Sequence, residues 1–63
     1  MNDKLIGDDG MGVFIYAGKC VDDDDYVTLR IEEEIDDNKY DAIAVDLHKS
    51  ELKNLINGLI DLL

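Results

Sequence analysis

The chain has 63 residues, a formal net charge of −10 and 46% hydrophobic residues, with no proline and one cysteine. A chain of this length forms one domain and buries only about 60% of its unfolded surface, so its core is expected to be marginal. One cysteine excludes an internal disulfide, and the acid excess disfavours direct binding to nucleic acid or to a membrane surface. The six basic residues are scattered and form no patch.

No segment has the pattern of a targeting or membrane-spanning sequence. Between the initial methionine and Gly7 the only apolar residues are Leu5 and Ile6, which are too few for the apolar core of a signal peptide. No apolar run approaches the roughly 20 residues that a transmembrane helix needs. Together with the unpaired cysteine, these features predict a cytoplasmic protein.

The N-terminal part is predicted to begin with a turn-rich lead-in over residues 1–11. This segment is rich in glycine and aspartate, and residues 4–6 suggest at most a short strand. The first full strand is expected at about residues 12–20, where hydrophobic side chains occupy both faces. One face carries Val13, Ile15 and Ala17, and the other carries Phe14 and Tyr16.

Two further strands are predicted at about residues 26–34 and 40–47, each preceded by an acidic turn. In the first of them Val27, Leu29 and Ile31 alternate with polar residues, which is typical of a strand with one face towards a core. In the second turn Asn38 is a candidate for a positive φ, because asparagine tolerates the left-handed conformation.

The C-terminal segment predicts an amphipathic helix at about residues 49–62. His48 is the candidate N-cap, because Glu51 lies three residues later and can accept its backbone N–H. Histidine is a poor N-cap, so Ser50 is the alternative. The apolar stripe of the helix consists of Leu52, Leu55, Ile56, Leu59, Ile60 and Leu63.

The order of these elements predicts an α+β fold: a three-stranded antiparallel β-meander with one C-terminal α-helix packed on one face. No repeat or linker divides residues 1–63, so they form a single small acidic domain. The apolar arc of the helix is wider than a small sheet covers, which favours a homodimer. The dimer would form through the helix or through the sheet face that carries Phe14, Tyr16, Ala42 and Ala44.

Ten carboxylates lie between residues 22 and 41, where only Arg30 and Lys39 oppose them. Consecutive turns of a meander lie at opposite ends of the sheet, so the acids should form two clusters about 30 Å apart. Such an array attracts basic protein surfaces and imitates a short phosphate backbone. Two tyrosines beside it are candidate aromatic anchors. The predicted partner-binding residues are Asp22, Asp23, Asp24, Asp25, Tyr26, Glu32, Glu33, Glu34, Asp36, Asp37 and Tyr40.

Other chemistries fit the sequence less well. A catalytic carboxylate pair needs a cleft, for which a small sheet under one helix leaves little room. Cys20 has acidic neighbours apart from Lys19, the opposite of the electropositive surroundings of reactive cysteines. The aspartate runs could bind divalent cations weakly, but an EF-hand loop starting at Asp22 would have Val27 where glycine is required. The sequence therefore predicts a non-enzymatic protein without a catalytic, cofactor or metal site.

In size, charge and carboxylate density the chain resembles small, acidic, phage-encoded inhibitors of host defence, including anti-CRISPR proteins and DNA mimics. This resemblance covers no motif that matches residue by residue. It implies a non-enzymatic inhibitor that occupies the basic nucleic-acid-binding surface of a host nuclease or another DNA- or RNA-binding protein. The alternative is a structural or assembly module that binds a partner through its apolar helix or sheet face, with the acid serving solubility.

Overall fold

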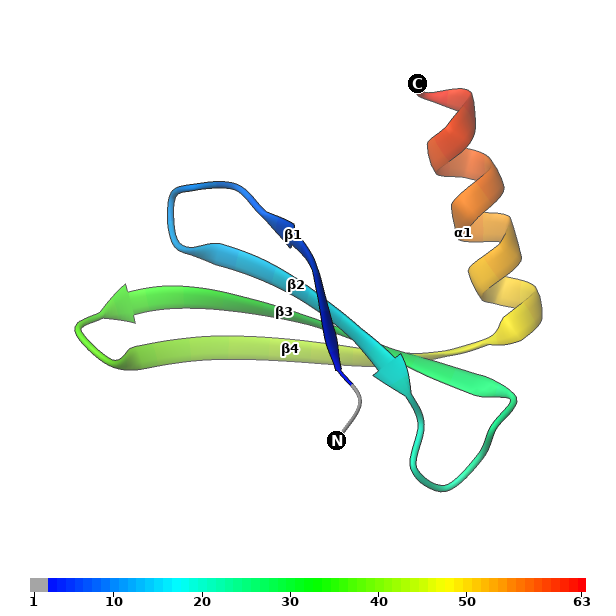
Figure 1. The fold of residues 1–63 in the computed structure, drawn as a ribbon, viewed down its shortest axis with the longest axis horizontal. Coiled ribbons are helices and arrows are strands. Elements are labelled where there is room, and N and C mark those ends of the chain that lie inside the picture. The colour runs from blue at the N-terminus through cyan, green and yellow to red at the C-terminus, as the bar shows by residue number, and fades with distance from the viewer. Residues whose placement is uncertain (1–2) are drawn as a thin grey trace.

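The computed structural model describes residues 3–63 and contains one antiparallel sheet followed by one helix (Figure 1). The elements are β1 (Lys4–Asp8), β2 (Val13–Lys19), β3 (Tyr26–Asp36), β4 (Lys39–His48) and α1 (Lys49–Asp61). The strand order is β1-β2-β3-β4, so β1 and β4 are the edges of the sheet. The predicted α+β class with a C-terminal helix is confirmed, whereas the prediction of three strands is wrong.

The fourth strand comes from the N-terminal segment that was expected to be a turn-rich lead-in. Residues 1 and 2 of that segment lie outside the described residues, and β1 pairs with β2 along Lys4–Asp8. The connecting turn contains Gly10 and Gly12 at φ values of 75° and 95°, a backbone region that favours glycine. The Asp9 carboxylate accepts the backbone N–H of Met11 at 2.7 Å. The glycines and aspartates therefore form a hairpin turn between two strands.

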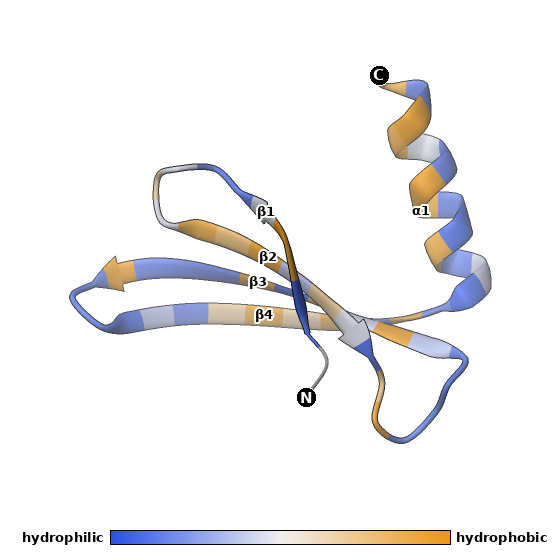
Figure 2. Ribbon diagram, viewed as in Figure 1, coloured by the Kyte–Doolittle hydropathy of each residue, from blue (hydrophilic) through white to orange (hydrophobic). Residues whose placement is uncertain are grey.

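Alternation along the strands gives the sheet two unlike faces. The apolar face contains two cross-strand rows, Ile15–Ile31–Ile43 and Ala17–Leu29–Val45, each running over β2, β3 and β4. The polar face contains Tyr16 opposite Arg30, and Glu34 opposite Tyr40. In Figure 2 hydrophobic and hydrophilic bands are mixed along β3 and β4, whereas β2 is hydrophobic over most of its length. Since a one-residue shift in register would exchange the faces, the hydrophobic pattern fixes the pairing.

The hairpin between β3 and β4 turns at Asp37 and Asn38, after a last strand pair between Asp36 and Lys39. Asn38 has a φ of 60°, so the predicted positive φ is confirmed. The Asp36 carboxylate accepts the backbone N–H of Asp37 at 2.8 Å. Local side-chain hydrogen bonds of this kind stabilise turns, which explains the aspartates at this position.

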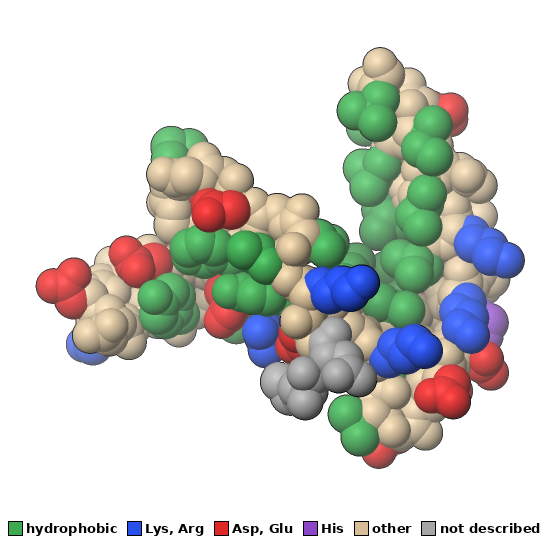
Figure 3. All heavy atoms as spheres, in the orientation of Figure 1, with side chains coloured by type: hydrophobic (Ala, Val, Ile, Leu, Met, Phe, Trp, Pro, Cys, Tyr) green, Lys and Arg blue, Asp and Glu red, His purple; other side chains and the backbone are tan. Residues whose placement is uncertain are grey.

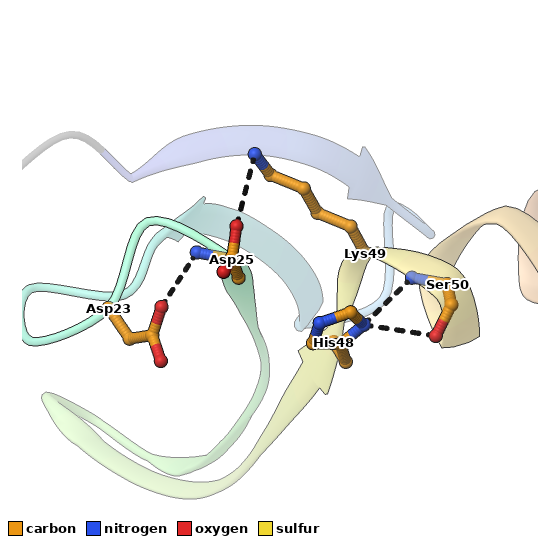
Figure 4. Close-up of polar contacts among 5 residues, drawn as sticks. All are labelled: Asp23, Asp25, His48, Lys49 and Ser50. Atoms are coloured by element: carbon orange, nitrogen blue, oxygen red, sulfur yellow. Dashed lines mark hydrogen bonds and ion pairs between the residues drawn. The ribbon is translucent and has the colours of Figure 1, made fainter.

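The N-cap of α1 is His48, as the sequence predicts. Its Nδ1 accepts the N–H of Ser50 at 3.2 Å, and the Glu51 carboxylate accepts the N–H of His48 at 3.1 Å. The backbone N–H of Lys49 donates to the carbonyl of Asp25 at 2.9 Å, and its Nζ lies 3.8 Å from the Asp25 carboxylate (Figure 4). These contacts attach the start of the helix to the turn between β2 and β3.

Beyond its first turn the helix covers little of the sheet. Among the strands, α1 lies close to β3 and β4 but not to β1 or β2, and it extends away from them (Figure 1). The molecule measures 37 × 32 × 15 Å, so it is thin in one direction. No side chain of residues 3–63 is fully buried. The helix therefore packs on only part of the face that it was predicted to cover.

Candidate functional site

An open apolar groove lies between α1 and the apolar face of the sheet. It encloses about 690 Å³, and every residue that lines it is hydrophobic. The sheet contributes Ile6, Ile15, Leu29, Ile31, Ile43, Ala44 and Val45, and the helix contributes Leu52, Leu55, Ile56 and Leu59. In Figure 3 hydrophobic side chains cover the side of α1 that faces the sheet, and basic side chains lie on its opposite side. The helix stripe that the sequence predicts as a core is therefore largely an exposed surface.

Two carboxylate side chains border the apolar face at the end near the β3–β4 turn. Glu33 and Asp41 lie opposite each other across β3 and β4, next to Ile31 and Ile43. The carboxylates follow the hydrophobic row because the strands continue their alternation beyond it. The face thus changes from hydrophobic to anionic within one cross-strand pair.

The predicted partner-binding residues lie in two groups at opposite ends of β3. The first comprises Asp22–Asp25 and Tyr26 around the β2–β3 turn, and the second comprises Glu32–Glu34, Asp36, Asp37 and Tyr40 around the β3–β4 turn. Their separation along β3 is about 30 Å, at roughly 3.3 Å per residue. Tyr26 and Glu32 are half-buried, and the other members are exposed. The structure therefore presents two anionic ends rather than one continuous site.

Several of these side chains make hydrogen bonds, aromatic contacts or ion pairs with other residues of the chain. The Asp23 carboxylate accepts the N–H of Asp25 at 2.9 Å and so shapes the first turn. The Tyr26 ring packs edge-on against His48, with centroids 5.3 Å apart. Glu32 lies 3.8 Å from the Arg30 guanidinium. Internal contacts of this kind restrict the positions of these side chains, although both groups lie on the surface.

Two further carboxylates, Asp8 and Asp9, join the second group. The β1–β2 turn lies at the same end of the meander as the β3–β4 turn, and the Glu34 N–H donates to the carbonyl of Gly12 at 2.8 Å. Sequence reasoning missed these residues because it did not predict β1 as a full strand of the sheet. The sequence did carry a signal, since Asp9-Gly10 followed by Gly12 has the composition of a hairpin turn.

Arg30 lies on the polar face of the sheet and contacts both an aromatic ring and two carboxylates. Its guanidinium carbon lies 4.8 Å from the centre of the Tyr16 ring, a cation–π contact. Its terminal nitrogens lie 3.4 Å from Asp3 and 3.8 Å from Glu32, while its Nε is buried without a hydrogen-bond partner. Arg30 thus neutralises local acid and serves the fold.

Tyr40 has a raised pKa because of its contact with Glu34. Its hydroxyl donates to the Glu34 carboxylate at 3.2 Å. This hydrogen bond first, and the negative charge of Glu34 second, raise the pKa of Tyr40 above its usual value of 10.0. The folded state therefore favours the neutral phenol. The stability that the contact contributes is complete below the pKa of the unfolded chain and is lost as pH rises through the higher pKa of the folded chain.

Replacing Glu34 with Gln is expected to lower the pKa of Tyr40 towards its usual value, because the variant removes the charge and keeps an oxygen acceptor. Alkaline titration of tyrosinate absorbance measures the change, and Tyr40→Phe identifies which step belongs to this residue. Glu33→Gln is the matched control, since it removes the same charge from a side chain on the opposite face. An equal effect of both Gln variants, or no effect of either, would contradict the assignment.

Within residues 3–63, no three His, Cys, Asp or Glu side chains come close enough together to hold a metal ion. Cys20 is half-buried and unpaired. The single helix of the described segment is too short and too polar to cross a membrane. The fold and surface thus define a small acidic α+β protein with two anionic ends and an open apolar groove. Comparison of the chain with protein-family models, curated proteins and solved structures finds no significant match.

Proposed function

We propose that the chain is a non-enzymatic inhibitor that binds the basic, nucleic-acid-binding surface of another protein through its two anionic ends. The observation that supports this proposal is the excess of exposed carboxylates on an ordered sheet. The chain has sixteen acidic and six basic residues, and ion pairs within the described residues involve only Asp3, Asp25 and Glu32. Most of the negative charge therefore remains free to meet a cationic partner.

The spacing of the ends suits a nucleic-acid-binding channel. Two carboxylate groups about 30 Å apart span a distance comparable to several nucleotide steps, since duplex DNA carries one charge per about 1.7 Å of axis. Turns shaped by Asp23 and Asp36 hold the groups in place, so binding loses little conformational entropy. Tyr40, an exposed member of the second group, supplies an aromatic contact. Inhibition would follow from occupation of the channel and exclusion of nucleic acid.

The test uses the four turn aspartates together. Replacing Asp22–Asp25 with Asn changes the net charge from −10 to −6, and Asn at position 23 keeps the acceptor that shapes the turn. Cell lysate is passed over immobilised protein, and the basic proteins retained are identified by mass spectrometry and eluted with double-stranded DNA. The variant is expected to lose at least about tenfold in affinity for such a protein, with a weaker salt dependence.

The matched control places the same charge change on the outer side of α1, as Asn54→Lys, Asn57→Lys and Asp61→Lys. It also has a net charge of −6 but leaves both anionic ends intact, so it should retain affinity within about threefold. Equal losses in both variants would show that only overall charge matters. Unchanged binding by the Asp22–Asp25 variant would overturn the proposal.

The apolar groove favours a second candidate function, that of an assembly module. In that case the groove makes the specific contact and the carboxylates serve solubility. Replacing Leu59 with Asp would then abolish partner binding, whereas neutralising Asp22–Asp25 would not. Circular dichroism of the Leu59 variant separates loss of the contact from loss of the fold.

A further inference from the structure

We infer that a second copy of this chain covers the apolar groove, so that the protein is a twofold symmetric homodimer. In this dimer α1 of each copy packs against the apolar face of the other. The inference goes beyond the proposed function and does not depend on it, because no residue of the two anionic ends lines the groove, although Glu33 borders it.

The accessible surface of the chain is larger than expected for a compact monomer, which supports a partner that covers part of it. Its accessible surface is 5231 Å², whereas a compact monomer of this mass, 7.1 kDa, is expected to expose about 4,100 Å². The excess is therefore about 1,100 Å² per chain. Two chains that bury this excess would form an interface of about 2,200 Å², which lies in the range of obligate homodimers.

The shape and length of the elements favour a second copy as the partner. The same surface contains a ridge, the helix with Leu55 and Leu59, and a groove floored by the row Ile15–Ile31–Ile43. A twofold interface requires such a self-complementary surface. The 13 residues of α1 span about 20 Å, enough to cross four strands spaced about 4.8 Å apart. The helix of one copy leaves β1 and β2 uncovered, where the partner's helix would lie.

Electrostatic repulsion between the chains also favours the apolar groove as the dimer interface. Two chains of net charge −10 repel each other unless their contact avoids the carboxylates, and no residue that lines the groove is ionisable. The opposite sheet face is less suitable, because Arg30 lies over Tyr16 there and binds Glu32. Of the two dimer surfaces that the sequence suggests, the structure therefore favours the helix. In such a dimer both anionic ends stay outside.

Sedimentation equilibrium of the full chain tests the inference across a range of concentrations. The expected mass is twice 7.1 kDa, with a thermal midpoint that rises with protein concentration. Replacing Leu59 with Asp should weaken association by more than about 100-fold, because it buries an uncompensated charge. Asn57→Asp is the matched control: it adds the same charge on the outer side of α1, at an exposed position outside the groove.

An NMR measurement on the wild-type chain keeps the test independent of how the variants fold. In a mixture of labelled and unlabelled copies, intermolecular contacts should join Leu55 and Leu59 of one copy to Ile15 and Ile31 of the other. A folded monomer at all concentrations would overturn the inference, whether its groove then bound lipid or another protein. A dimer with intermolecular contacts through Tyr16 would overturn it equally.

Discussion

Replacing Leu29 with Ala is expected to lower the free energy of unfolding by about 2 kcal/mol, the low end of the loss for a fully buried leucine, because Leu29 is only half-buried. Leu29 is half-buried on β3, lies between Ala17 and Val45, and lines the groove. A domain of this length has a total stability of only about 3–9 kcal/mol. The substitution should therefore lower the thermal midpoint sharply, as circular dichroism or urea unfolding would measure.

Leu63→Ala is the control for this prediction, because it removes the same atoms from a side chain that is fully exposed beyond the end of α1. It should change the free energy of unfolding by less than about 0.5 kcal/mol. Comparable losses in the two variants would show that the apolar face does not stabilise the fold.

Replacing Arg30 with Met is expected to cost about 1–2 kcal/mol, more at low salt than at high salt. The variant keeps a long apolar side chain beside Tyr16 but removes the cation shared by Asp3 and Glu32. Two half-exposed carboxylates then repel each other without a counter-charge. Urea unfolding at low and high ionic strength measures both the loss and its screening.

Lys39→Met is the control that separates the effect of the local contacts of Arg30 on stability from the effect of net charge. Both variants change the chain from −10 to −11, but Lys39 lies in the β3–β4 hairpin and makes no ion pair within the described residues. The Arg30 variant should be the less stable of the two by about 1 kcal/mol. If the two variants unfolded alike, Arg30 would act only through overall charge.

Periodicity and local turn chemistry made much of the fold predictable. The alternation of Val27, Leu29 and Ile31 marks β3, and the spacing of His48 and Glu51 marks the start of α1, because both signals lie within a few residues. Asn38 was predictable for the same reason. β1 was not predicted as a full strand, because it is short and contains Gly7, and it pairs with β2 by closing a hairpin through glycines.

The candidate sites were predictable only in part. The sequence indicates where the carboxylates gather, but not that Glu32 is held by Arg30 or Glu34 by Tyr40, since these contacts depend on register across the sheet. It indicates the apolar stripe of the helix, but not how much of it stays uncovered. That depends on the angle at which α1 leaves β4, a tertiary property that periodicity does not contain.

The position of β4 at the edge of the sheet has a consequence for handling the protein. Its ten residues pair with β3 on one side only, so the backbone groups on the other side are available to extend a sheet. Electrostatic repulsion between chains opposes such growth at neutral pH. Near the isoelectric point of about 4.1 that barrier disappears, and acidified solutions should favour ordered fibrillar aggregates built by edge-to-edge strand addition.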